Sequence, residues 1–311
     1  MAHIAVAGLI NVETTLRIDH FPLEYQPQYF PFFGVRTTVS GVGYNVARAL
    51  SVLGNHVALL SMIGDDLQGQ MIRSMLVEDG IDAGDVLVTM PQSPQSVIVY
   101  DASGRRASFT DLKDIQERAY PGARFAQLVA ECDACVLCNI NFARGLLPVA
   151  QRLGKLVATD IHTIAAVDDE FNRDFMAAAD VLFCSDERLP LAPEAWVRAV
   201  ARRYNPAIQV VGLGSQGALL FERGAAEPCH IPARPLRPVV NTIGAGDSLF
   251  SAFLHAYLPS GNAWQALRLA TLFAGWKIGG NGGADGLLTG AELAELAARH
   301  LELNGIASVR L

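Results

Sequence analysis

The feature that most constrains the fold of this chain is the alternation of short apolar segments with segments of helical periodicity. The runs HIAVAGL at 3–9, HVALLSMIG at 56–64 and IQVVG at 208–212 are almost wholly apolar, and helix-like segments such as 43–53 and 263–277 lie between or after them. Strands that are apolar on both faces are typical of a parallel sheet covered by helices on each side. The pattern predicts an α/β fold with a mostly parallel central sheet and helices on both faces.

The same alternation continues along the rest of the chain. Further strands are expected at 134–139, 156–160 and 181–184, and further helices at 66–80, 123–131, 143–153, 170–178, 194–203 and 291–300. In such sheets ligands bind at the carboxyl ends of the strands. The loops to inspect are therefore 8–13, 64–68, 139–141, 160–162, 185–188, 212–217 and 241–247.

Two segments break the alternation. Residues 12–38 are rich in aromatic residues, Pro and Thr, and residues 96–110 alternate polar with apolar residues and turn at Ser103-Gly104, which is typical of a hairpin. We expect both to form a small β lid over one edge of the main sheet. The sequence shows no internal repeat and no interdomain linker, so we expect one α/β domain over 1–311 with this lid inserted in it.

Charge and hydropathy exclude two classes of partner. The formal net charge is −7, whereas sequence-independent nucleic-acid binding needs a basic surface. No apolar run reaches the roughly 20 residues that a membrane-spanning helix needs. The first residues, MAHIAVAGLINVE, read as a strand rather than a signal peptide. The expectation is a cytoplasmic protein that binds neither nucleic acid nor membrane.

Three cysteines, Cys132, Cys135 and Cys138, have the C-x-x-C-x-x-C spacing of thiolate metal sites. The alternative is a buried strand that tolerates small, soft side chains. An extended strand would send Cys135 and Cys138 to opposite faces, and no fourth cysteine lies nearby. We therefore interpret the three residues as core. The other two cysteines, Cys184 and Cys229, look unpaired, as in a reducing compartment.

A glycine motif, GLGSQG at 212–217, matches the G-x-G-x-x-G pattern of dinucleotide-binding folds. That pattern needs a strand before it and a helix after it, and here the strand-like ALLFE follows. A nicotinamide-dependent oxidoreductase is therefore disfavoured. The sequence also lacks a P-loop and the common hydrolase and zinc-protease motifs.

A second glycine motif, NTIGAGDSLF at 241–250, opens an apolar helix-like segment. Free backbone N–H groups and the positive end of the helix dipole meet at such a position, and small side chains let an anion approach them. Asp247 follows the glycines directly. From these residues alone, Asp247 is equally an N-terminal cap or a catalytic carboxylate.

Three segments together resemble the ribokinase-like (PfkB) carbohydrate kinases. SGVGYNVARALSVLG at 40–54, followed by SMIGDDLQG at 61–69, resembles the family's amino-terminal signature, and NTIGAGD resembles its carboxyl-terminal D-T-x-G-A-G-D. GLINVE at 8–13 is similar to the family's opening Gly-x-x-Asn-x-Asp. The resemblance covers essentially the whole chain and implies a ribokinase-like fold and ATP-dependent phosphorylation.

The resemblance also implies roles for individual residues. Asp247 would be the base that takes the proton from an acceptor hydroxyl, and the amides of Gly244, Ala245 and Gly246 would form an anion hole for the transferring phosphoryl group. The implied substrate-binding residues are Asn11, Glu13, Gly41, Gly43 and Asn45. The implied nucleotide-binding residues are Gly214, Gly217 and Thr242, and Mg²⁺ would bridge the ATP phosphates with largely water ligands.

Some positions depart from the family pattern. Asn241 replaces the first Asp of D-T-x-G-A-G-D, which removes a charge near the loop where many members bind a monovalent cation, so strong K⁺ dependence is not expected. The family's N-x-x-E is replaced by Ser185 to Arg188, with Glu187 one position away as a candidate metal ligand. Glu13 replaces an Asp and reaches one methylene further.

The leading hypothesis is an ATP-dependent kinase that transfers the γ-phosphoryl group of MgATP to a hydroxymethyl group of a sugar or nucleoside. The alternative is a sensor with the same fold that binds such a ligand without chemistry. AGWKIGGNGGADG at 274–286 resembles ketohexokinase-like members and CNIN at 138–141 resembles pseudouridine-kinase-like members, so the substrate stays open. Exposed strand edges in the lid predict a homodimer formed through it.

Overall fold

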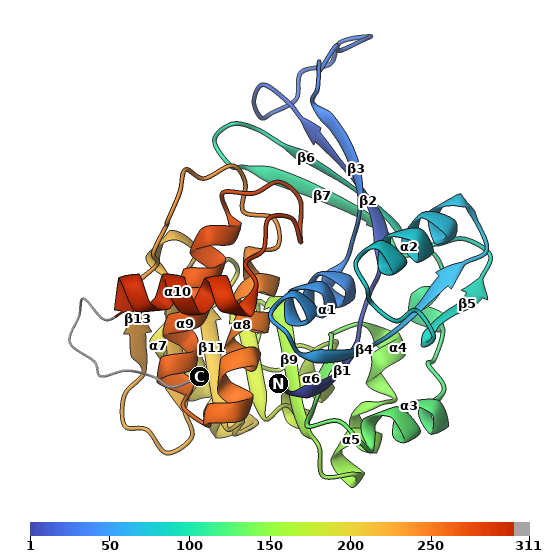
Figure 1. Cartoon of the computed structure of the whole chain (residues 1–311). Helices are drawn as coiled ribbons and strands as arrows, with labels where there is room; N and C mark the ends of the chain where they lie inside the picture. The colour runs from blue at the N-terminus through green and yellow to red at the C-terminus, as the bar shows by residue number, and fades with distance from the viewer. Residues whose placement is uncertain (302–311) are drawn as a thin grey trace.

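The computed structural model describes residues 1–301, and its centre is a nine-stranded sheet (Figure 1). The strand order is β13-β12-β11-β10-β9-β8-β1-β4-β5; the pairs from β11 to β5 are parallel, and β12 and β13 are antiparallel additions at one edge. The strands are β1 (His3–Ala7), β4 (His56–Gly64), β5 (Val86–Met90), β8 (Ala134–Leu137), β9 (Leu156–Thr163), β10 (Val181–Ser185), β11 (Ile208–Gly212), β12 (Ala218–Glu222) and β13 (Cys229–Ile231).

Helices cover both faces of this sheet, as the sequence predicts. In β1, Ile4 and Val6 belong to one buried cluster and Ala5 and Ala7 to the other. The first cluster is completed by α1 (Val42–Val52), α2 (Leu67–Glu78), α8 (Ala245–Ser260), α9 (Ala263–Lys277) and α10 (Gly290–Leu301). The second is completed by α3 (Gly122–Val129), α4 (Asn141–Arg144), α5 (Leu147–Arg152), α6 (Arg173–Ala178) and α7 (Pro193–Arg203).

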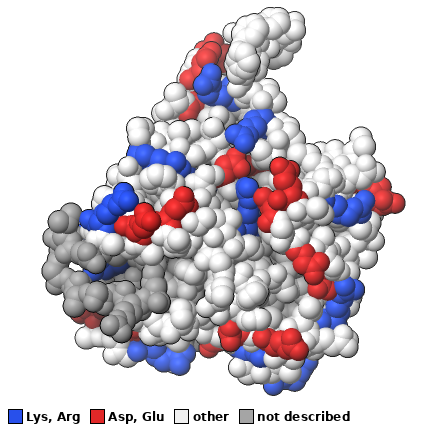
Figure 2. All heavy atoms as spheres, in the orientation of Figure 1, with Lys and Arg blue, Asp and Glu red and all other residues white. Residues whose placement is uncertain are grey.

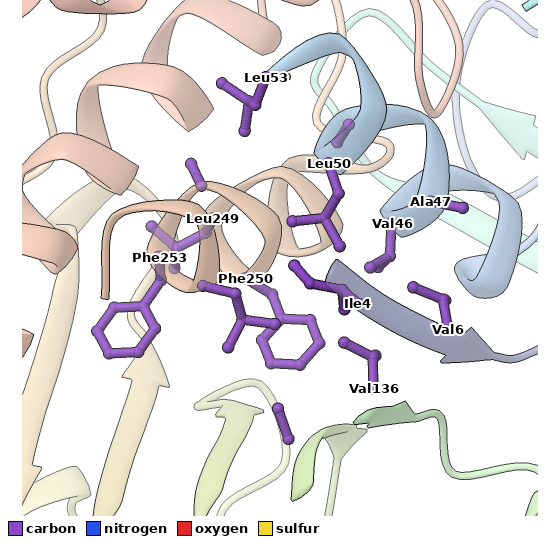
Figure 3. Close-up of a cluster of buried hydrophobic side chains, with 14 of the residues drawn as sticks. Ile4, Val6, Val46, Ala47, Leu50, Leu53, Val136, Leu249, Phe250 and Phe253 are labelled. Carbon is purple, nitrogen blue, oxygen red and sulfur yellow. The ribbon is translucent and has the colours of Figure 1, made fainter. Parts of the chain in front are cut away.

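The two helices that carry the glycine motifs pack together over β1. Leu50 of α1 and Phe250 of α8 lie beside Ile4 (Figure 3), Phe253 of α8 packs on Phe183 of β10, and these helix side chains are almost completely buried. Each such side chain stabilises the fold by about 1.5–3 kcal/mol through its burial. The packing fixes the amino-terminal ends of α1 and α8 beside each other, above the strand ends.

A second sheet of four strands, in the order β3-β2-β6-β7, projects from one end of the main body (Figure 1). It consists of β2 (Asn11–Arg17), β3 (Val35–Ser40), β6 (Gln95–Tyr100) and β7 (Arg106–Asp111), so the lid expected from 12–38 and 96–110 is present. One face of this sheet carries Glu13, Ser96, Thr38 and Thr110, which are paired across neighbouring strands, and is termed the inner face of the lid.

Several expected elements differ in detail. The segment 143–153 is not one helix but two, α4 and α5, because Pro148 in the first turn of α5 has no N–H to donate to the preceding turn. The helix after Asp247 continues past Pro259 to Ser260, where Gly261 ends it in a left-handed conformation. Strand β5 was not anticipated. The expected single domain extends to residue 311, and 302–311 lie outside the described part.

The C-x-x-C-x-x-C cysteines are core residues, as the sequence analysis favours. Cys135 lies in the cluster on one face of the sheet and Cys138 in the cluster on the other. Burial raises the pKa of the Cys135 thiol to about 12, so it is not a thiolate at neutral pH. Among residues 1–301, no three His, Cys, Asp or Glu side chains are grouped so as to hold a metal ion.

None of the described helices is long and apolar enough to cross a membrane. On the face drawn in Figure 2, acidic and basic side chains are interspersed, and the outermost tip of the lid carries neither.

Candidate active site

The candidate site lies at the carboxyl end of β1, next to the point where the strand order reverses between β1 and β8. Here the loop after β1 touches the start of α1, with the Gly43 N–H donating to the Leu9 carbonyl at 2.9 Å. A Cβ atom on Gly43 would lie 2.5 Å from the backbone of Gly8. Glycine is therefore required at position 43 for backbone packing, and the same close approach brings Asn45 over the end of β1.

The two signature motifs meet through one hydrogen bond. Asn45 Nδ2, in the first turns of α1, donates to Asp247 Oδ2, in the first turn of α8, at 2.8 Å. Gly244 is the N-cap of α8, and no side chain caps that helix. Asp247 therefore does not act as the cap, which was one of the two roles that its position allowed.

Burial dominates the electrostatics of Asp247 and raises the pKa of its carboxyl group above the usual value. The charge of Asp160 raises this pKa further, whereas His162, the hydrogen bond from Asn45 and Lys277 lower it. A carboxylate with a raised pKa is a stronger base than an exposed Asp, while its neighbours keep the ionised form accessible.

Backbone amides open the helix beside Asp247. Gly244 has a φ of 73°, and a Cβ atom there would lie 1.9 Å from the Gly283 carbonyl oxygen, so only glycine fits. The Ala245 N–H donates to the Thr242 carbonyl at 3.2 Å. Within residues 1–301 the structure gives no backbone acceptor to the N–H groups of Gly244 and Gly246. Two of the three expected amides are thus free to bind an anion.

Three buried oxygen atoms near Asp247 have no hydrogen-bond partner in the described part of the chain. They are Asn11 Oδ1, Glu13 Oε1 and Asn45 Oδ1, on side chains that are 3–6% exposed. All three atoms accept hydrogen bonds, and leaving buried acceptors unpaired is unfavourable. A ligand with several hydroxyl donors would satisfy them.

The inner face of the lid shapes this acceptor cluster. Asn11 Nδ2 donates to Ser96 Oγ at 2.8 Å, which turns Asn11 Oδ1 away from β6. A Cβ atom on Gly41, whose φ is 99°, would lie 2.5 Å from the Leu9 carbonyl and 3.1 Å from Asn11 Oδ1. Gly41 therefore lets the lid strand β3 join α1 without displacing Asn11.

Glu13 is the charged member of the cluster. Burial raises the pKa of its carboxyl group, and the nearby charge of Asp247 raises it further. A hydrogen bond with Ser40 and the charges of Arg106 and Lys277 lower it. Glu13 therefore has a carboxyl group of raised pKa and one buried oxygen without a partner.

Of the residues expected to contact a nucleotide, Gly214 and Gly217 follow β11 and Thr242 lies in the loop before α8. Gly217 has a φ of 105°, and a Cβ atom there would lie 2.1 Å from the Ile231 carbonyl, so this glycine is needed for packing against β13. Gly214 faces open space, and Thr242 is exposed. The motif at 212–217 is followed by the antiparallel strand β12, which excludes the dinucleotide-binding arrangement.

Within the described residues 1–301, no cluster of acidic, His or Cys side chains is placed to hold a metal ion. Glu187 is exposed after β10, where its N–H donates to Ser185 Oγ at 3.2 Å, and Arg188 is exposed beside it. The donor set fits a Mg²⁺ ion that is bound through phosphate oxygens and water with at most one carboxylate from the chain.

Two features of the site were missed by the motif analysis. Asp160 lies within β9, which continues to Thr163 through one of the segments marked for inspection, and its Oδ2 lies 3.9 Å from where a Cβ on Gly246 would be. Lys277 ends α9, is fully buried and donates from Nζ to the Ile243 carbonyl at 2.9 Å. A lysine at the end of a helix is ordinarily exposed to solvent, so nothing in the sequence predicted that Lys277 is buried.

The fold, the contact between Asn45 and Asp247, and the free amides agree with the arrangement that the ribokinase-like resemblance predicts. The family described as pfkB family carbohydrate kinase matches residues 1–289, and the chain belongs to this family. It is a carbohydrate or nucleoside kinase with the expected α/β ribokinase-like fold.

Relatives of known activity resemble it over most of their length. It is 27% identical over 257 residues to the acarbose 7(IV)-phosphotransferase of Actinoplanes sp., covering 82% of this chain and 85% of that protein. It is 26% identical over 310 residues to the ATP-dependent ribose-1-phosphate kinase of Halopiger xanaduensis, covering 96% and 99%. A microbiome-derived acarbose kinase superposes with a TM-score of 0.86 at 27% identity, covering 96% of this chain and 99% of that one.

Proposed function

We propose that this kinase transfers the γ-phosphoryl group of ATP to a hydroxymethyl group of a sugar or nucleoside, with Asp247 as the general base. The observation that carries the proposal is the hydrogen bond of 2.8 Å between Asn45 and Asp247. It supports the proposal because it holds Asp247, whose carboxyl pKa is raised by burial, against Asn45, one of the three residues with an unpaired acceptor, the others being Asn11 and Glu13. A hydroxyl-rich acceptor bound there would present one hydroxyl to Asp247.

The reaction is a single displacement at phosphorus. Asp247 takes the hydroxyl proton, the oxygen forms a bond to the γ-phosphorus, and the bond from that phosphorus to the bridging oxygen of ADP breaks. The free amides of Gly244 and Gly246 would stabilise the negative charge on the transferring group. Ala245, whose N–H is held by Thr242, would contribute less than these two.

PfkB kinases use ATP and Mg²⁺, and a bound Mg²⁺ neutralises phosphate charge during transfer. On this chain we assign the nucleotide to the open edge near Gly214 and Thr242. Gly217 would affect nucleotide binding indirectly, because its close packing against β13 sets the conformation of the loop. We assign Glu187 as the candidate carboxylate that would contact the metal or its water ligands. Asn241 carries no charge, so we expect no strong dependence on K⁺.

The outer face of the lid, opposite the inner face, supports a homodimer. Val35, Val97 and Phe109 on this face are 58%, 43% and 64% exposed, and the connecting segment adds Phe32 at 78% and Phe33 at 105%. An apolar sheet face and an aromatic tip open to water are unusual for a monomer, and a second copy of the same lid would cover them. All five cysteines are free thiols, which fits the cytoplasm.

The proposal is tested by a screen for acceptor-dependent ADP release. The panel should contain monosaccharides, ribose 1-phosphate, deoxyribose, nucleosides and acarbose, because relatives are named for several of these. Turnover of one acceptor, with the phosphate ester identified by ³¹P NMR, is the expected result. Tight binding of a panel member without any turnover would instead support a non-catalytic sensor, for which the changes at Asn241 and Ser185–Arg188 argue.

A further inference from the structure

Lys277 is fully buried and contacts the loop 241–246, which is termed the amide loop. The proposed reaction gives this lysine no role. Removing an ammonium group from water is strongly unfavourable unless charges or dipoles compensate it. Its Nζ has one recorded hydrogen bond in the described structure, to the Ile243 carbonyl oxygen at 2.9 Å. Ile243 is the residue that immediately precedes Gly244.

Hydrogen bonds hold the peptide groups on both sides of Ile243, and the second of these groups carries the Gly244 N–H. The Ile243 N–H donates to Asn241 Oδ1 at 3.1 Å, and its carbonyl accepts from Lys277. In a planar trans peptide the carbonyl of Ile243 and the N–H of Gly244 point in opposite directions. Lys277 therefore holds the Gly244 N–H on the side away from itself, where it is free to bind an anion.

Four charged groups face Lys277 from the elements around it. Asp247 belongs to α8, Glu13 to β2 and Asp285 to the segment before α10, and Arg237 precedes the amide loop. Burial lowers the pKa of Lys277 to about 8; the three carboxylates oppose this shift and Arg237 adds to it. In return the Lys277 charge lowers the pKa of both Asp247 and Glu13.

We propose that Lys277 is a built-in cation of the active site, a positioning residue that orients the Gly244 amide and keeps Asp247 ionised. The inference rests on the proposed function of Asp247 and the amides. The Ile243 carbonyl is already occupied by this ammonium group and Asn241 is neutral, so the described residues do not fit a monovalent metal cation held by this loop. Lys277 replaces such an ion.

Variants at Lys277 separate charge from hydrogen bonding. Lys277→Met removes both, Lys277→Gln keeps a donor without charge, and Lys277→Ala leaves room for an external cation. We expect kcat to fall on the order of 100-fold in Lys277→Met, with the acceptor KM changed only a few-fold. We expect ammonium or methylammonium to restore part of the activity of Lys277→Ala, while the wild type is indifferent to K⁺.

Lys155 provides the matched control. Its Nζ also donates to backbone carbonyls, those of Ala130 and Cys132 at 2.8 Å, but far from the amide loop. Lys155→Met should lower stability and leave kcat and cation response unchanged.

The pH dependence gives readouts that a structural lysine would not change. The alkaline limb of kcat/KM should fall near pH 8 in the wild type and disappear in Lys277→Met, whose acid limb should move to higher pH.

A buried lysine of lowered pKa destabilises the fold most below that pKa, and the penalty is relieved as pH rises toward its unfolded value. Lys277→Met should therefore match or exceed wild-type stability at pH 7, with the difference shrinking above pH 8.

A probe that needs no acceptor distinguishes the two proposals. Aluminium fluoride should tighten MgADP binding in the wild type by mimicking the transferring phosphoryl group, and Lys277→Met should lose most of this tightening. A wild type that shows neither tightening nor turnover would refute the proposed function. A wild type that shows both, with Lys277→Met retaining both and the alkaline limb, would overturn the role of Lys277.

Discussion

At the scale of single residues, the site depends on backbone positions that only glycine can occupy. Gly244 combines a φ of 73° with a Cβ position 1.9 Å from the Gly283 carbonyl oxygen. We expect Gly244→Ala to reduce the free energy of unfolding by on the order of 3 kcal/mol and to abolish most turnover, because the amide loop must shift. Chemical denaturation and kcat would be measured together.

Gly80 is the matched control for this prediction. It has a similar φ of 67° after α2, but no atom lies within 4 Å of its Cβ position. Gly80→Ala should cost about 1 kcal/mol from backbone strain alone and leave kcat unchanged. Equal losses of stability in the two variants would show that the contact with Gly283 is not restrictive.

Glu13 should control recognition of the acceptor. Its Oε1 is buried and unpaired, so a shorter side chain withdraws an acceptor from the substrate. We expect Glu13→Asp to raise the acceptor KM about 10-fold or more and to leave the ATP KM unchanged. A change confined to the ATP KM would contradict the placement of the acceptor against the lid.

The base should titrate above the usual range of an aspartate. Burial raises the pKa of Asp247 above the model-peptide value of 3.8, and only the ionised form can take a proton. Activity should therefore be lost as pH falls through this raised pKa, which the acid limb of kcat/KM reports. An acid limb at or below pH 3.8 in an otherwise stable protein would argue against Asp247 as the base.

At the scale of elements, the lid exposes large apolar side chains to solvent. Phe109 is 64% exposed on the outer face of β7. If two lids pair, Phe109→Lys should convert a dimer into a monomer by placing a charge in an apolar interface. Light scattering gives the mass, and Val77→Lys on α2, where Val77 is 76% exposed, is the control. A wild-type monomer at micromolar concentration would refute the dimer.

Most elements could be predicted from the sequence because strand and helix signals are strong in a covered parallel sheet. The boundaries of the strand at 56–64 and of the helix at 263–277 are confirmed to the residue. The break between α4 and α5 was missed because Pro148 follows an otherwise helical pattern. Strand β5 was missed because its VLVTM sequence is short and only half buried.

The site was predictable where it is made of motifs and not where it is made of tertiary contacts. Asn45 and Asp247 could be brought together only through the family resemblance, since they are 202 residues apart. Lys277 contacts Ile243 because α9 returns beneath the amide loop, and no local pattern encodes that return. The unpaired oxygens of Asn11 and Glu13 likewise become visible only when the lid sheet is in place.

At the scale of the whole molecule, the main sheet and the lid both contribute residues to the proposed site of phosphoryl transfer. In the proposed reaction, the base and the amides lie at the strand ends of the main sheet, and the lid adds acceptors that would bind hydroxyl groups. The step on which this reaction depends most is removal of the acceptor proton by Asp247. Asp66 offers a comparison, because it also opens a helix but acts as a cap, accepting from the Gly69 N–H at 2.8 Å.

The most direct measurement is acceptor-dependent ADP release by Asp247→Asn beside the wild type and Asp66→Asn. The asparagine keeps an oxygen for the Asn45 hydrogen bond but cannot take a proton. We expect kcat to fall about 1,000-fold in Asp247→Asn with ADP affinity preserved, and Asp66→Asn to lose stability with kcat retained. Near-wild-type turnover by Asp247→Asn would contradict the role of Asp247 as the general base.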